Sequence, residues 1–391
     1  MKQGWELKTL GDVCSVQRGL TYSGKDTVDY SSTVVLRATN IDLDSSSLVF
    51  DELKYLRDDF EIKEKYELKK GSLLICFSSG SKSHLGKVAL VDKHYKYAFG
   101  GFIGQITPSN NIDPKYLFYS LISEDYKSYI AQLTDGVNIN NLKIKDLQGF
   151  QIPVPPLEEQ KQIVAKLDQC FEAIDKAKAN ATKNLENAKE LFQSKLNEIF
   201  SQKGEGWVEK KLGDVCKYDK NKNQSNNLPY IGLEHIESNS GRFIGSLDSH
   251  QVKSSTFHFD SRHVLYGRLR PYLNKVLIPN FEGHCSTEIF PILVGNEIIR
   301  EYLFYWLISD QTVKKIDATW TGARMPRANM NEVINFILPI PQVEEQKQIV
   351  KLLGNLREQT QSLESKYQQE LNSLEELKKS ILQKAFEGEL V

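Results

Sequence analysis

The side chains best suited to chemistry in this chain lie in two polar loops, and the chemistry they suit is nucleic-acid binding. Residues 77–87 read FSSGSKSHLGK, in which small hydroxyl side chains, glycines and two lysines favour contacts to phosphates. Residues 266–275 read YGRLRPYLNK. Arg268 and Arg270 alternate, so an extended backbone would point both the same way, and each guanidinium offers guanine two hydrogen bonds.

A third polar cluster extends this set of candidates. Residues 321–329 correspond to 135–141, and both segments contain glycine and precede a proline-rich stretch. Each loop taken alone is also explained as a solvated hairpin, but unlike loops at matching places favour contact surfaces. The predicted DNA-binding residues are Arg37, Asn40, Ser79, Lys82, Ser83, His84, Lys87, Arg268, Arg270, Tyr272, Lys275, Arg324 and Arg327.

The sequence shows no pattern of a catalytic centre. Its seven histidines lack a metal-binding spacing, its five cysteines form no CxxC pair, and there is no P-loop. Residues 226–230, NNLPY, look like the Asn-Pro-Pro-Tyr motif of adenine methyltransferases, but Leu228 replaces the first proline. Residues 99–104, FGGFIG, are followed by turn residues instead of a helix, which favours a buried strand over a methyl-donor loop. We therefore expect no metal and no cofactor in this chain.

The bulk composition is that of an ordinary globular protein of two or three domains. The chain has 391 residues, a hydrophobic fraction of 40% and a net charge of −1. Nucleic acid would therefore bind through local clusters and not through a basic surface. No apolar run approaches the roughly 20 residues of a membrane span, and the amino terminus has no signal-peptide core. These features predict a cytoplasmic protein.

An internal repeat sets the positions of the polar loops. YLFYSLIS at 116–123 returns as YLFYWLIS at 302–309, an offset of 302 − 116 = 186, and EEQKQIV at 158–164 returns at 344–350 with the same offset. LGDVC at 10–14 returns at 212–216, an offset of 212 − 10 = 202. The chain is therefore two copies of one unit, alike at their ends and unlike in their middles.

Each copy is predicted to be an α+β, mostly strand domain followed by a long helix. Short apolar runs broken by Gly, Ser, Asn and Asp indicate strands and turns, with one helix from about Pro114 to Leu133. After the prolines of each exit, apolar residues recur every three or four positions for about 45 residues, a helix of about 68 Å. The predicted boundaries are 1–155 and 204–341 for the domains, and 156–203 and 342–391 for the helices.

The two helices are expected to pack as an antiparallel coiled coil with one domain at each end. Helices this long need another long element to cover their apolar faces, and each leads away from its own domain. Ala177, Ala181 and Ala188 on the first helix permit close approach. The alternative, that each helix packs only along its own domain, is disfavoured because about 68 Å exceeds a domain of this size.

Together these features resemble the specificity subunit of a Type I restriction–modification system. The motif PxPxxEEQKxIV ends both domains, at 153–164 and 339–350, and a long helix follows each time. The resemblance covers the whole chain. It also rests on the LGDV start of each half, on RPYLNK at 270–275 followed by CSTE at 285–288, and on the carboxyl-terminal AFEGELV at 385–391.

The resemblance implies a non-catalytic subunit that reads DNA. Each domain would be a target recognition domain for one half of a bipartite site in double-stranded DNA, and the helices would fix the spacer and dock two methylation subunits. Those subunits would bring S-adenosylmethionine, and a restriction motor subunit would bring ATP and Mg. The predicted partner-binding residues are Glu158, Glu159, Gln160, Glu344, Glu345 and Gln346. A coiled-coil adaptor without DNA sequence specificity and a self-contained methyltransferase stay open as alternatives.

Overall fold

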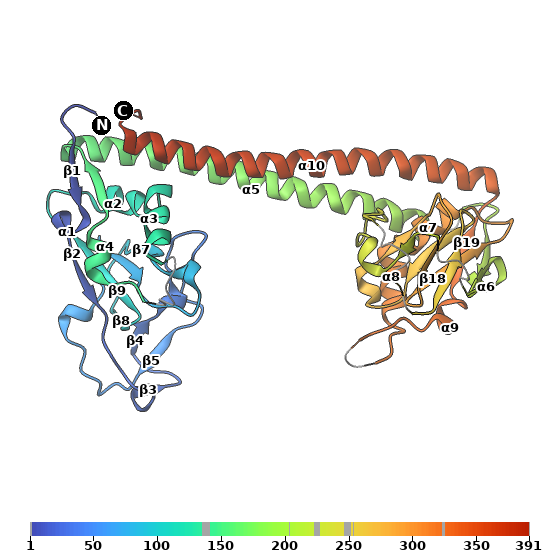
Figure 1. The fold of residues 1–391 in the computed structure, drawn as a ribbon, viewed down its shortest axis with the longest axis horizontal. Coiled ribbons are helices and arrows are strands. Elements are labelled where there is room, and N and C mark those ends of the chain that lie inside the picture. The colour runs from blue at the N-terminus through green and yellow to red at the C-terminus, as the bar shows by residue number, and fades with distance from the viewer. Residues whose placement is uncertain are drawn as a thin grey trace. The chain divides into compact units, whose positions relative to one another are not determined.

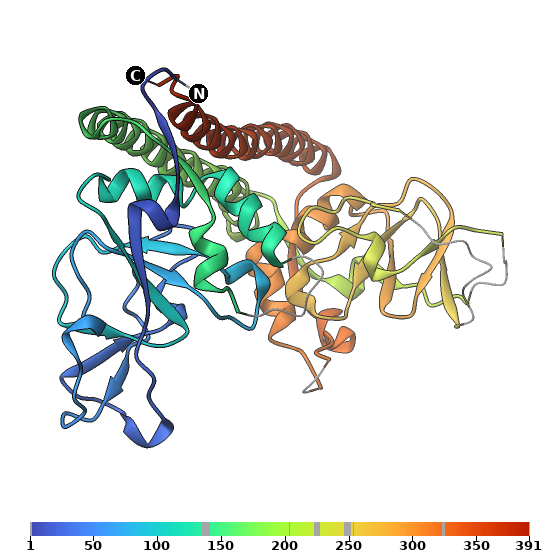
Figure 2. The ribbon, with the colours of Figure 1, turned by 60° about the vertical axis from the view of Figure 1, so that its left-hand side comes forward.

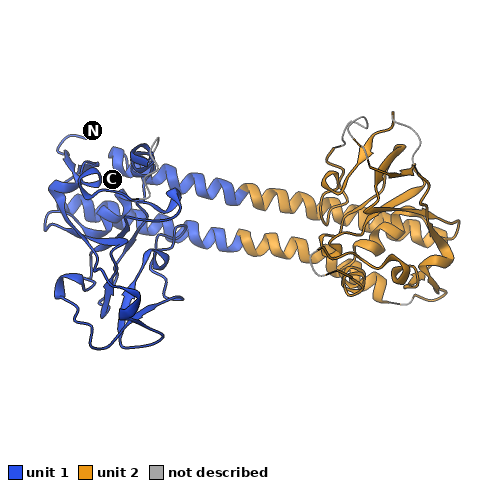
Figure 3. Cartoon of the chain, turned by 60° about the horizontal axis from the view of Figure 1, so that its bottom comes forward, with its two compact units in different colours: residues 1–180, 370–391 blue, residues 181–369 orange. Residues whose placement is uncertain are grey.

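The structure is a computed structural model, and it divides the chain into two compact units (Figure 3). Unit 1 comprises Met1–Asn180 and Glu370–Val391, and unit 2 comprises Ala181–Gln369. The residues described are 2–134, 141–202, 204–222, 227–245, 252, 254–322 and 325–390. Each unit holds one strand-rich domain and part of each long helix. The predicted boundaries instead treated each long helix as a separate segment.

In its described residues, unit 1 contains two four-stranded sheets and one two-stranded ribbon. The antiparallel sheet β2-β9-β6-β7 is formed by β2 (Cys14–Arg18), β9 (Ile103–Pro108), β6 (Leu73–Cys76) and β7 (Val88–Leu90). The sheet β3-β5-β4-β8 is formed by β3 (Thr27–Val28), β5 (Lys54–Leu56), β4 (Thr33–Leu36) and β8 (Tyr97–Phe99). The ribbon pairs β1 (Glu6–Thr9) with β10 (Gln151–Val154), which joins the start of the domain to its proline-rich exit.

Short helices cover the first sheet of unit 1 (Figure 1). They are α1 (Leu10–Val13), α2 (Pro114–Ser120), α3 (Glu124–Thr134) and α4 (Ile144–Gln148). Asp113 caps α2 by accepting hydrogen bonds from the backbone N–H groups of Lys115 and Tyr116. The single helix predicted here is wrong: it is broken after Ser120, because the hydroxyl of Ser123 accepts the Tyr126 N–H and starts a new helix.

Unit 2 repeats this frame. Its antiparallel sheet β12-β18-β15-β16 has the strand order of β2-β9-β6-β7 and is formed by β12 (Cys216–Tyr218), β18 (Ile289–Val294), β15 (His263–Gly267) and β16 (Val276–Leu277). A second sheet is formed by β13 (Tyr230–Ile231), β17 (Gly283–Ser286) and β14 (Thr256–Phe259), and the ribbon by β11 (Val208–Lys211) and β19 (Ile337–Ile340). The helices are α6 (Leu212–Val215), α7 (Arg300–Ile308), α8 (Asp310–Asp317) and α9 (Met330–Val333).

The long helices α5 (Leu157–Ser201) and α10 (Val343–Glu387) each contain 45 residues, as the periodicity predicts. In unit 1 they run antiparallel: Lys178 pairs with Glu375, and Asp175, three residues earlier, pairs with Lys378, three residues later. In unit 2, Leu196 of α5 and Leu353 of α10 lie in the same hydrophobic core. The predicted fold class, two strand-rich α+β domains with antiparallel long helices, is confirmed.

Each domain packs against the start of its own helix and the end of the other one. Phe386, near the end of α10, packs edge-on against Tyr116 of unit 1, with ring centroids 5.2 Å apart. Phe200, near the end of α5, packs in the same way against Tyr302 of unit 2, at 5.3 Å. Both chain termini consequently lie in unit 1, where they approach each other (Figure 2). Among the described residues, no helix combines the length and apolar character of a membrane span.

Candidate nucleic-acid interface

Both units build the same small backbone frame where the polar loops meet the antiparallel sheet. In unit 2 this frame, the second platform, is formed by Arg268, Leu269, Glu288, Arg327 and Ala328. The N–H of Arg268 donates to the carbonyl of Glu288 at 2.9 Å, and the N–H of Ala328 donates to the carbonyl of Arg268 at 2.9 Å. Leu269 pairs with Arg327 as an isolated antiparallel bridge. Main-chain bonds thus hold three distant segments together whatever their side chains are.

The first platform, in unit 1, repeats these bonds. It is formed by Phe77, Ser78, Phe102, Asn141 and Leu142. The N–H of Phe77 donates to the carbonyl of Phe102 at 2.9 Å, and the N–H of Leu142 donates to the carbonyl of Phe77 at 2.7 Å. Ser78 and Asn141 form the matching isolated bridge.

Equivalent positions of the two platforms carry unlike side chains. Phe102 corresponds to Glu288 (288 − 102 = 186), and Asn141 corresponds to Arg327 (327 − 141 = 186). An exposed ring in unit 1 is thus replaced by a carboxylate in unit 2, and an amide is replaced by a guanidinium. A constant frame with exchanged side chains is the arrangement that lets two similar domains recognise different partners.

A shared carboxylate organises the side chains of the second platform. Glu288 accepts hydrogen bonds from Nε of Arg268 at 3.0 Å and from Nη2 of Arg327 at 2.9 Å, and Nε of Arg327 also contacts it at 3.0 Å. Burial raises the pKa of Glu288, but the Arg327 hydrogen bonds and the Arg268 charge outweigh it, so the pKa is lowered overall. One negative charge between two positive charges leaves the cluster net positive.

In the first platform, the amide of Asn141 takes the place of the carboxylate as the shared hydrogen-bond acceptor. Oδ1 of Asn141 accepts hydrogen bonds from Nη2 of Arg18 at 2.7 Å and from the hydroxyl of Ser78 at 2.8 Å. Arg18 also donates to the carbonyl of Leu142 at 2.8 Å. The guanidinium is therefore fixed against this platform without a carboxylate.

A cation lies over a phenyl ring at the same place in both units. Arg18 lies over Phe77, 4.8 Å from the ring centroid, and Lys220, its equivalent (220 − 18 = 202), lies over Phe290 at 4.9 Å. The rings come from different strands. Gly104 corresponds to Phe290 (290 − 104 = 186), and a Cβ added to Gly104 would lie 2.3 Å from the Phe77 ring. Phe77 therefore fills the space that Phe290 fills in unit 2, and the pairing of cation and ring is kept.

Five residues that make contacts within or beside their own platform were not predicted as DNA-binding: Arg18, Asn141, Phe102, Lys220 and Glu288. Two signals were present. The offset of 186 pairs Asn141 with a predicted residue, Arg327, and Glu288 closes the CSTE motif. The cation at the end of β2 gave no signal, because its importance depends on a ring that lies far away in the sequence.

The predicted residues of the first polar loop differ in exposure: Lys82 and Ser83 are exposed, whereas Ser79, His84 and Lys87 are half-buried. Lys82, Ser83 and Lys87 line one pocket of about 430 Å³ in unit 1. Lys82 donates to the carbonyl of Thr134 at 3.1 Å, and Ser83 shares a hydrogen bond with Ser81. His84 is half-buried at the end of a short 3-10 helix, and Ser79 accepts the Ser81 N–H at 3.2 Å. Their role in DNA binding stays a prediction.

Two other predicted residues of unit 1 serve the fold. Asn40 is 1% exposed, its oxygen accepts the N–H of Arg37, and its amide donates to the carbonyls of Val49 and Glu52. We therefore correct the prediction that Asn40 is a DNA-binding residue, because its side chain is buried and its polar atoms are bonded within the fold. Lys87 donates to the carbonyl of Ile41 at 2.6 Å, and burial lowers its pKa. The guanidinium of Arg37 reaches the Glu52 carbonyl at 3.4 Å and remains partly exposed.

The second polar loop is not extended as predicted. Arg270 has φ of 51°, in the left-handed region, and its N–H donates to the carbonyl of Pro326 at 2.8 Å. A 3-10 helix, Pro271–Leu273, follows at once. The expectation that Arg268 and Arg270 point the same way from one strand is wrong, because the chain turns at Arg270. Arg268 belongs to the platform, whereas the side chain of Arg270 is exposed beyond it.

The remaining predicted residues of unit 2 divide between surface and interior. Tyr272 is 52% exposed beside Arg270. Lys275 donates to the carbonyls of Leu233 and Ile236 at 2.7 and 2.8 Å, which gives its ammonium a role in the fold. Arg324 lies outside the described residues.

The two glutamines predicted to bind a partner instead fasten each helix to its own domain. Gln160 is fully buried: Oε1 accepts the N–H of Asp113 at 2.8 Å, and Nε2 donates to the carbonyls of Asn111 and Pro155. Gln346 makes the same three bonds 186 residues later, to Ile299, Glu297 and Pro341. We correct the partner prediction for both glutamines, since no part of their amides reaches the surface.

The neighbouring glutamates differ in exposure. Glu158 and Glu344 are about 80% exposed, and each pairs with the lysine three residues later. Glu159 binds the ammonium of Lys2 at 2.8 Å, and Glu345 accepts the indole N–H of Trp207 at 2.8 Å. Only Glu158 and Glu344 of the six therefore keep a wholly outward position from which to meet a partner.

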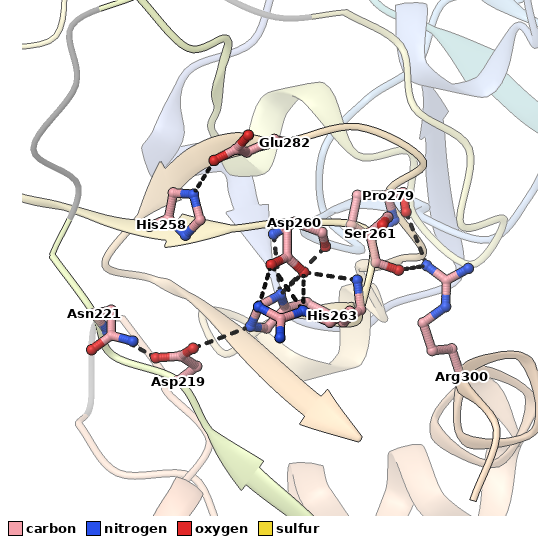
Figure 4. Close-up of polar contacts among 10 residues, drawn as sticks. Asp219, Asn221, His258, Asp260, Ser261, His263, Pro279, Glu282 and Arg300 are labelled. Atoms are coloured by element: carbon pink, nitrogen blue, oxygen red, sulfur yellow. Dashed lines mark hydrogen bonds and ion pairs between the residues drawn. The ribbon is translucent and has the colours of Figure 1, made fainter. Parts of the chain in front are cut away.

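A separate titratable cluster in unit 2 joins the end of β12 to the start of β15 (Figure 4). His263 is 1% exposed, with Nδ1 3.0 Å from Asp260 and Nε2 3.3 Å from Asp219. Hydrogen bonds from Arg262 hold the pKa of Asp260 well below its usual range. None of these residues belongs to the second platform. Within the described part of the chain, no group of three or more His, Cys, Asp or Glu is arranged to hold a metal ion.

The comparisons with known proteins point to one family. The family model described as Type I restriction modification DNA specificity domain matches residues 2–187 and again residues 204–373. The StySPI specificity subunit of Salmonella potsdam, a Type I restriction enzyme subunit, is 27% identical over 428 residues, covering 100% of this chain and 90% of that protein. The EcoKI specificity subunit of Escherichia coli (strain K12) is 26% identical over 436 residues, with the same shares covered.

Solved structures share the fold. A chain from a study of complex assembly and conformational transition in the type I R-M system aligns with a TM-score of 0.80 at 20% identity, covering 100% of this chain and 99% of that one. The HsdS subunit from Thermoanaerobacter tengcongensis aligns with a TM-score of 0.61 at 20% identity, covering 100% and 98%.

Proposed function

Because this chain belongs to the Type I restriction modification DNA specificity domain family, we propose that it is the DNA-reading subunit of a Type I restriction–modification complex. The observation that carries the proposal is the pair of platforms, which share their main-chain bonds and differ in their side chains. We infer that each unit reads one half of a bipartite site in double-stranded DNA. The chain itself would perform no catalysis.

Positions that carry similar side chains in both units are assigned to phosphate contacts, and positions that carry different side chains are assigned to base contacts. Arg18 and Lys220 occupy equivalent positions over a ring, so we assign them to the phosphate backbone, whose charge is the same in every sequence. Ser78, Phe102 and Asn141 have unlike counterparts in unit 2, so we assign these positions to base edges, which differ between half-sites. Arg270 and Tyr272, exposed next to the second platform, extend the reading surface of unit 2.

The long helices would set the spacer between the half-sites. Each contains 45 residues, which corresponds to about 68 Å, or roughly 20 base pairs at 3.4 Å each. A continuous helix without proline resists bending, so its length is a suitable measure of distance.

Two methylation subunits would bind this chain and bring S-adenosylmethionine, and a restriction subunit would bring ATP and Mg. Outward leucines on the helices, Leu191, Leu352 and Leu377, are 52%, 50% and 46% exposed and would be covered by such partners. The outward Glu158 and Glu344 lie at equivalent helix starts, as two copies of one partner would require. We place the complex in the cytoplasm, where it would meet DNA.

The test is a long-read map of adenine methylation in cells that express this chain with its methylation subunit. We expect one split motif with a fixed spacer that disappears when this chain is removed. If the methylation subunit is present and bound but no motif depends on this chain, the DNA-reading function is refuted. The coiled-coil adaptor, which the family membership does not favour, would then become the leading explanation.

A further inference from the structure

Glu288 is the one carboxylate of the second platform, and it touches both platform arginines. Its carboxylate accepts Nε of Arg268 at 3.0 Å and both Nε and Nη2 of Arg327 at 3.0 and 2.9 Å. The three side chains are 22%, 31% and 37% exposed for Glu288, Arg268 and Arg327. They are thus held in place by one another and still reach solvent.

The contacts use different edges of the two guanidinium groups. Arg327 presents its Nε–Nη2 side to Glu288. Nε donates to Oε2 at 3.1 Å and Nη2 donates to Oε1 at 2.9 Å, the two-point geometry typical of a structural arginine–carboxylate pair. Arg268 uses Nε alone and lies over the Phe290 ring, 5.3 Å from its centroid. Its Nη1–Nη2 edge is not used by Glu288, and that edge is the fork that binds O6 and N7 of guanine.

We propose that Glu288 is a positioning residue that aims Arg268 at a guanine in the second half-site, with Arg327 holding the carboxylate in place. The proposal rests on the proposed DNA-reading function and names the residues that set its specificity in unit 2. Glu288 is not itself the reader, because a carboxylate between two arginines has its acceptors occupied. Its effect on DNA passes through the orientation of Arg268.

A positioning carboxylate favours DNA binding because it restricts the Arg268 side chain before the DNA binds. An unrestrained arginine has many rotamers and loses side-chain entropy when a base fixes it. The Glu288 bond and the Phe290 ring restrain the side chain before DNA arrives, and the main-chain bonds at Arg268 hold the backbone that carries it. Two arginines against one carboxylate also leave a net positive charge facing the DNA, which a single ion pair would not.

The first platform has no carboxylate at the position of Glu288, so the proposal applies to one half-site only. Phe102 stands where Glu288 stands, and the guanidinium of Arg18 is held by the amide of Asn141. A change at Glu288 should therefore alter recognition of the half-site read by unit 2 and leave the other half-site as it was.

The experiment measures discrimination by the complex of this chain with its methylation subunit, using DNA panels with single-base changes in each half-site. For Arg268→Ala we expect discrimination at one base pair of the second half-site to fall about 5- to 150-fold. Glu288→Gln should lower discrimination at that same base pair by at least about threefold, because the arginine is no longer held by a charge. The double variant should match Arg268→Ala, since Glu288 acts only through Arg268.

Two further variants separate positioning from folding. Glu282→Gln removes another carboxylate of unit 2, one that pairs with His258 at the surface, and should leave discrimination unchanged. Glu288→Asp keeps the charge on a shorter side chain and should recover part of the discrimination lost in Glu288→Gln. Thermal unfolding of each complex shows whether any variant fails to fold.

Each outcome has one meaning. If Arg268→Ala relaxes the second half-site but Glu288→Gln and Glu288→Asp do not, the positioning role is overturned and the DNA-reading function stands. Equal losses at both half-sites, together with lower thermal stability, would make Glu288 a merely structural residue. If the wild-type complex itself shows no split motif, it is the proposed function that fails.

Discussion

Replacing Gln160 by methionine removes the amide that fastens α5 to its domain while keeping a side chain of similar length. The amide makes three hydrogen bonds to main-chain groups, those of Asp113, Asn111 and Pro155, and the side chain is fully buried. Methionine offers none of these bonds. The three main-chain groups are then left without their partner in the interior.

The size of the effect follows from those three groups. A buried donor or acceptor left unsatisfied costs about 1–3 kcal/mol, and movement of the 111–113 loop toward water recovers part of that. We expect the free energy of unfolding of unit 1 to fall by about 2–5 kcal/mol. For a unit of this size, that lowers Tm by about 4–20 °C, since each 1 kcal/mol corresponds to roughly 2–4 °C.

The assay combines thermal unfolding with hydrogen exchange. The N–H of Asp113 donates directly to Gln160, so its exchange should accelerate in the variant, while amides of unit 2 keep their rates. Gln162→Met is the matched control: Gln162 is exposed two residues away, and its replacement should change stability by less than about 0.5 kcal/mol. Gln346→Met should reproduce the whole effect in unit 2, because Gln346 makes the same three bonds.

The result that refutes this reasoning is a Gln160→Met protein as stable as Gln162→Met. Such a result would mean that the helix is held by its apolar face alone, through Ile163, Leu167 and Ile174. Faster amide hydrogen exchange in unit 2 of the Gln160→Met protein would instead mean that the Gln160 hydrogen bonds also stabilise unit 2.

Three other predictions follow from the structure. Arg18→Ala and Lys220→Ala should each weaken binding to all DNA sequences alike and reduce the slope of log K against log salt by about 0.9, as for a lost phosphate contact; relaxed specificity at one base would contradict this assignment. Adding one helical turn to both α5 and α10 lengthens each by about 5.4 Å and should widen the spacer by roughly one to two base pairs with both half-sites unchanged; a methylation map with an unaltered spacer would exclude the ruler. Arg262 lowers the pKa of Asp260 in the folded state, so the unfolded chain binds more protons at low pH. The stabilisation of the folded state by ionised Asp260 is therefore complete above the ordinary pKa of 3.8. It is lost as the pH falls through the lower folded-state pKa. Asp260→Asn should therefore flatten the loss of stability measured by denaturant titration between about pH 5 and pH 3, and an unchanged pH profile would show that the pair contributes nothing.

The long helices were predictable because they depend on short-range pattern, and the repeated frame was predictable because whole motifs recur at a fixed offset. A 45-residue helix follows from apolar residues at every third or fourth position. Its length implies a long partner, and the antiparallel direction follows because each helix leads away from its own domain. The break between α2 and α3 was missed because it depends on one hydroxyl, that of Ser123, which competes with the helix.

The recognition surface was less predictable, because tertiary contacts decide which polar side chains stay outside. Asn40 and Gln160 look like surface residues by type, yet main-chain groups distant in the sequence satisfy them in the interior. Arg270 was expected in a strand, but its N–H bonds to Pro326 and the chain turns. A pattern of residue types cannot show such partners.

The exchange of Phe77 for Phe290 shows how this frame tolerates change. The ring beneath the cation comes from Phe77, directly after β6, in unit 1 and from Phe290 of β18 in unit 2. Gly104, the counterpart of Phe290, leaves room for the Phe77 ring. The platform bonds join main-chain groups only, so Ser78 and Leu269, or Asn141 and Arg327, can occupy the same place without loss of those bonds. A substitution at these positions therefore changes the exposed polar groups and leaves the main-chain bonds in place. Under the proposed function, the cation and the frame would preserve affinity for the DNA backbone while the base contacts change, so one chain could hold two different recognition surfaces.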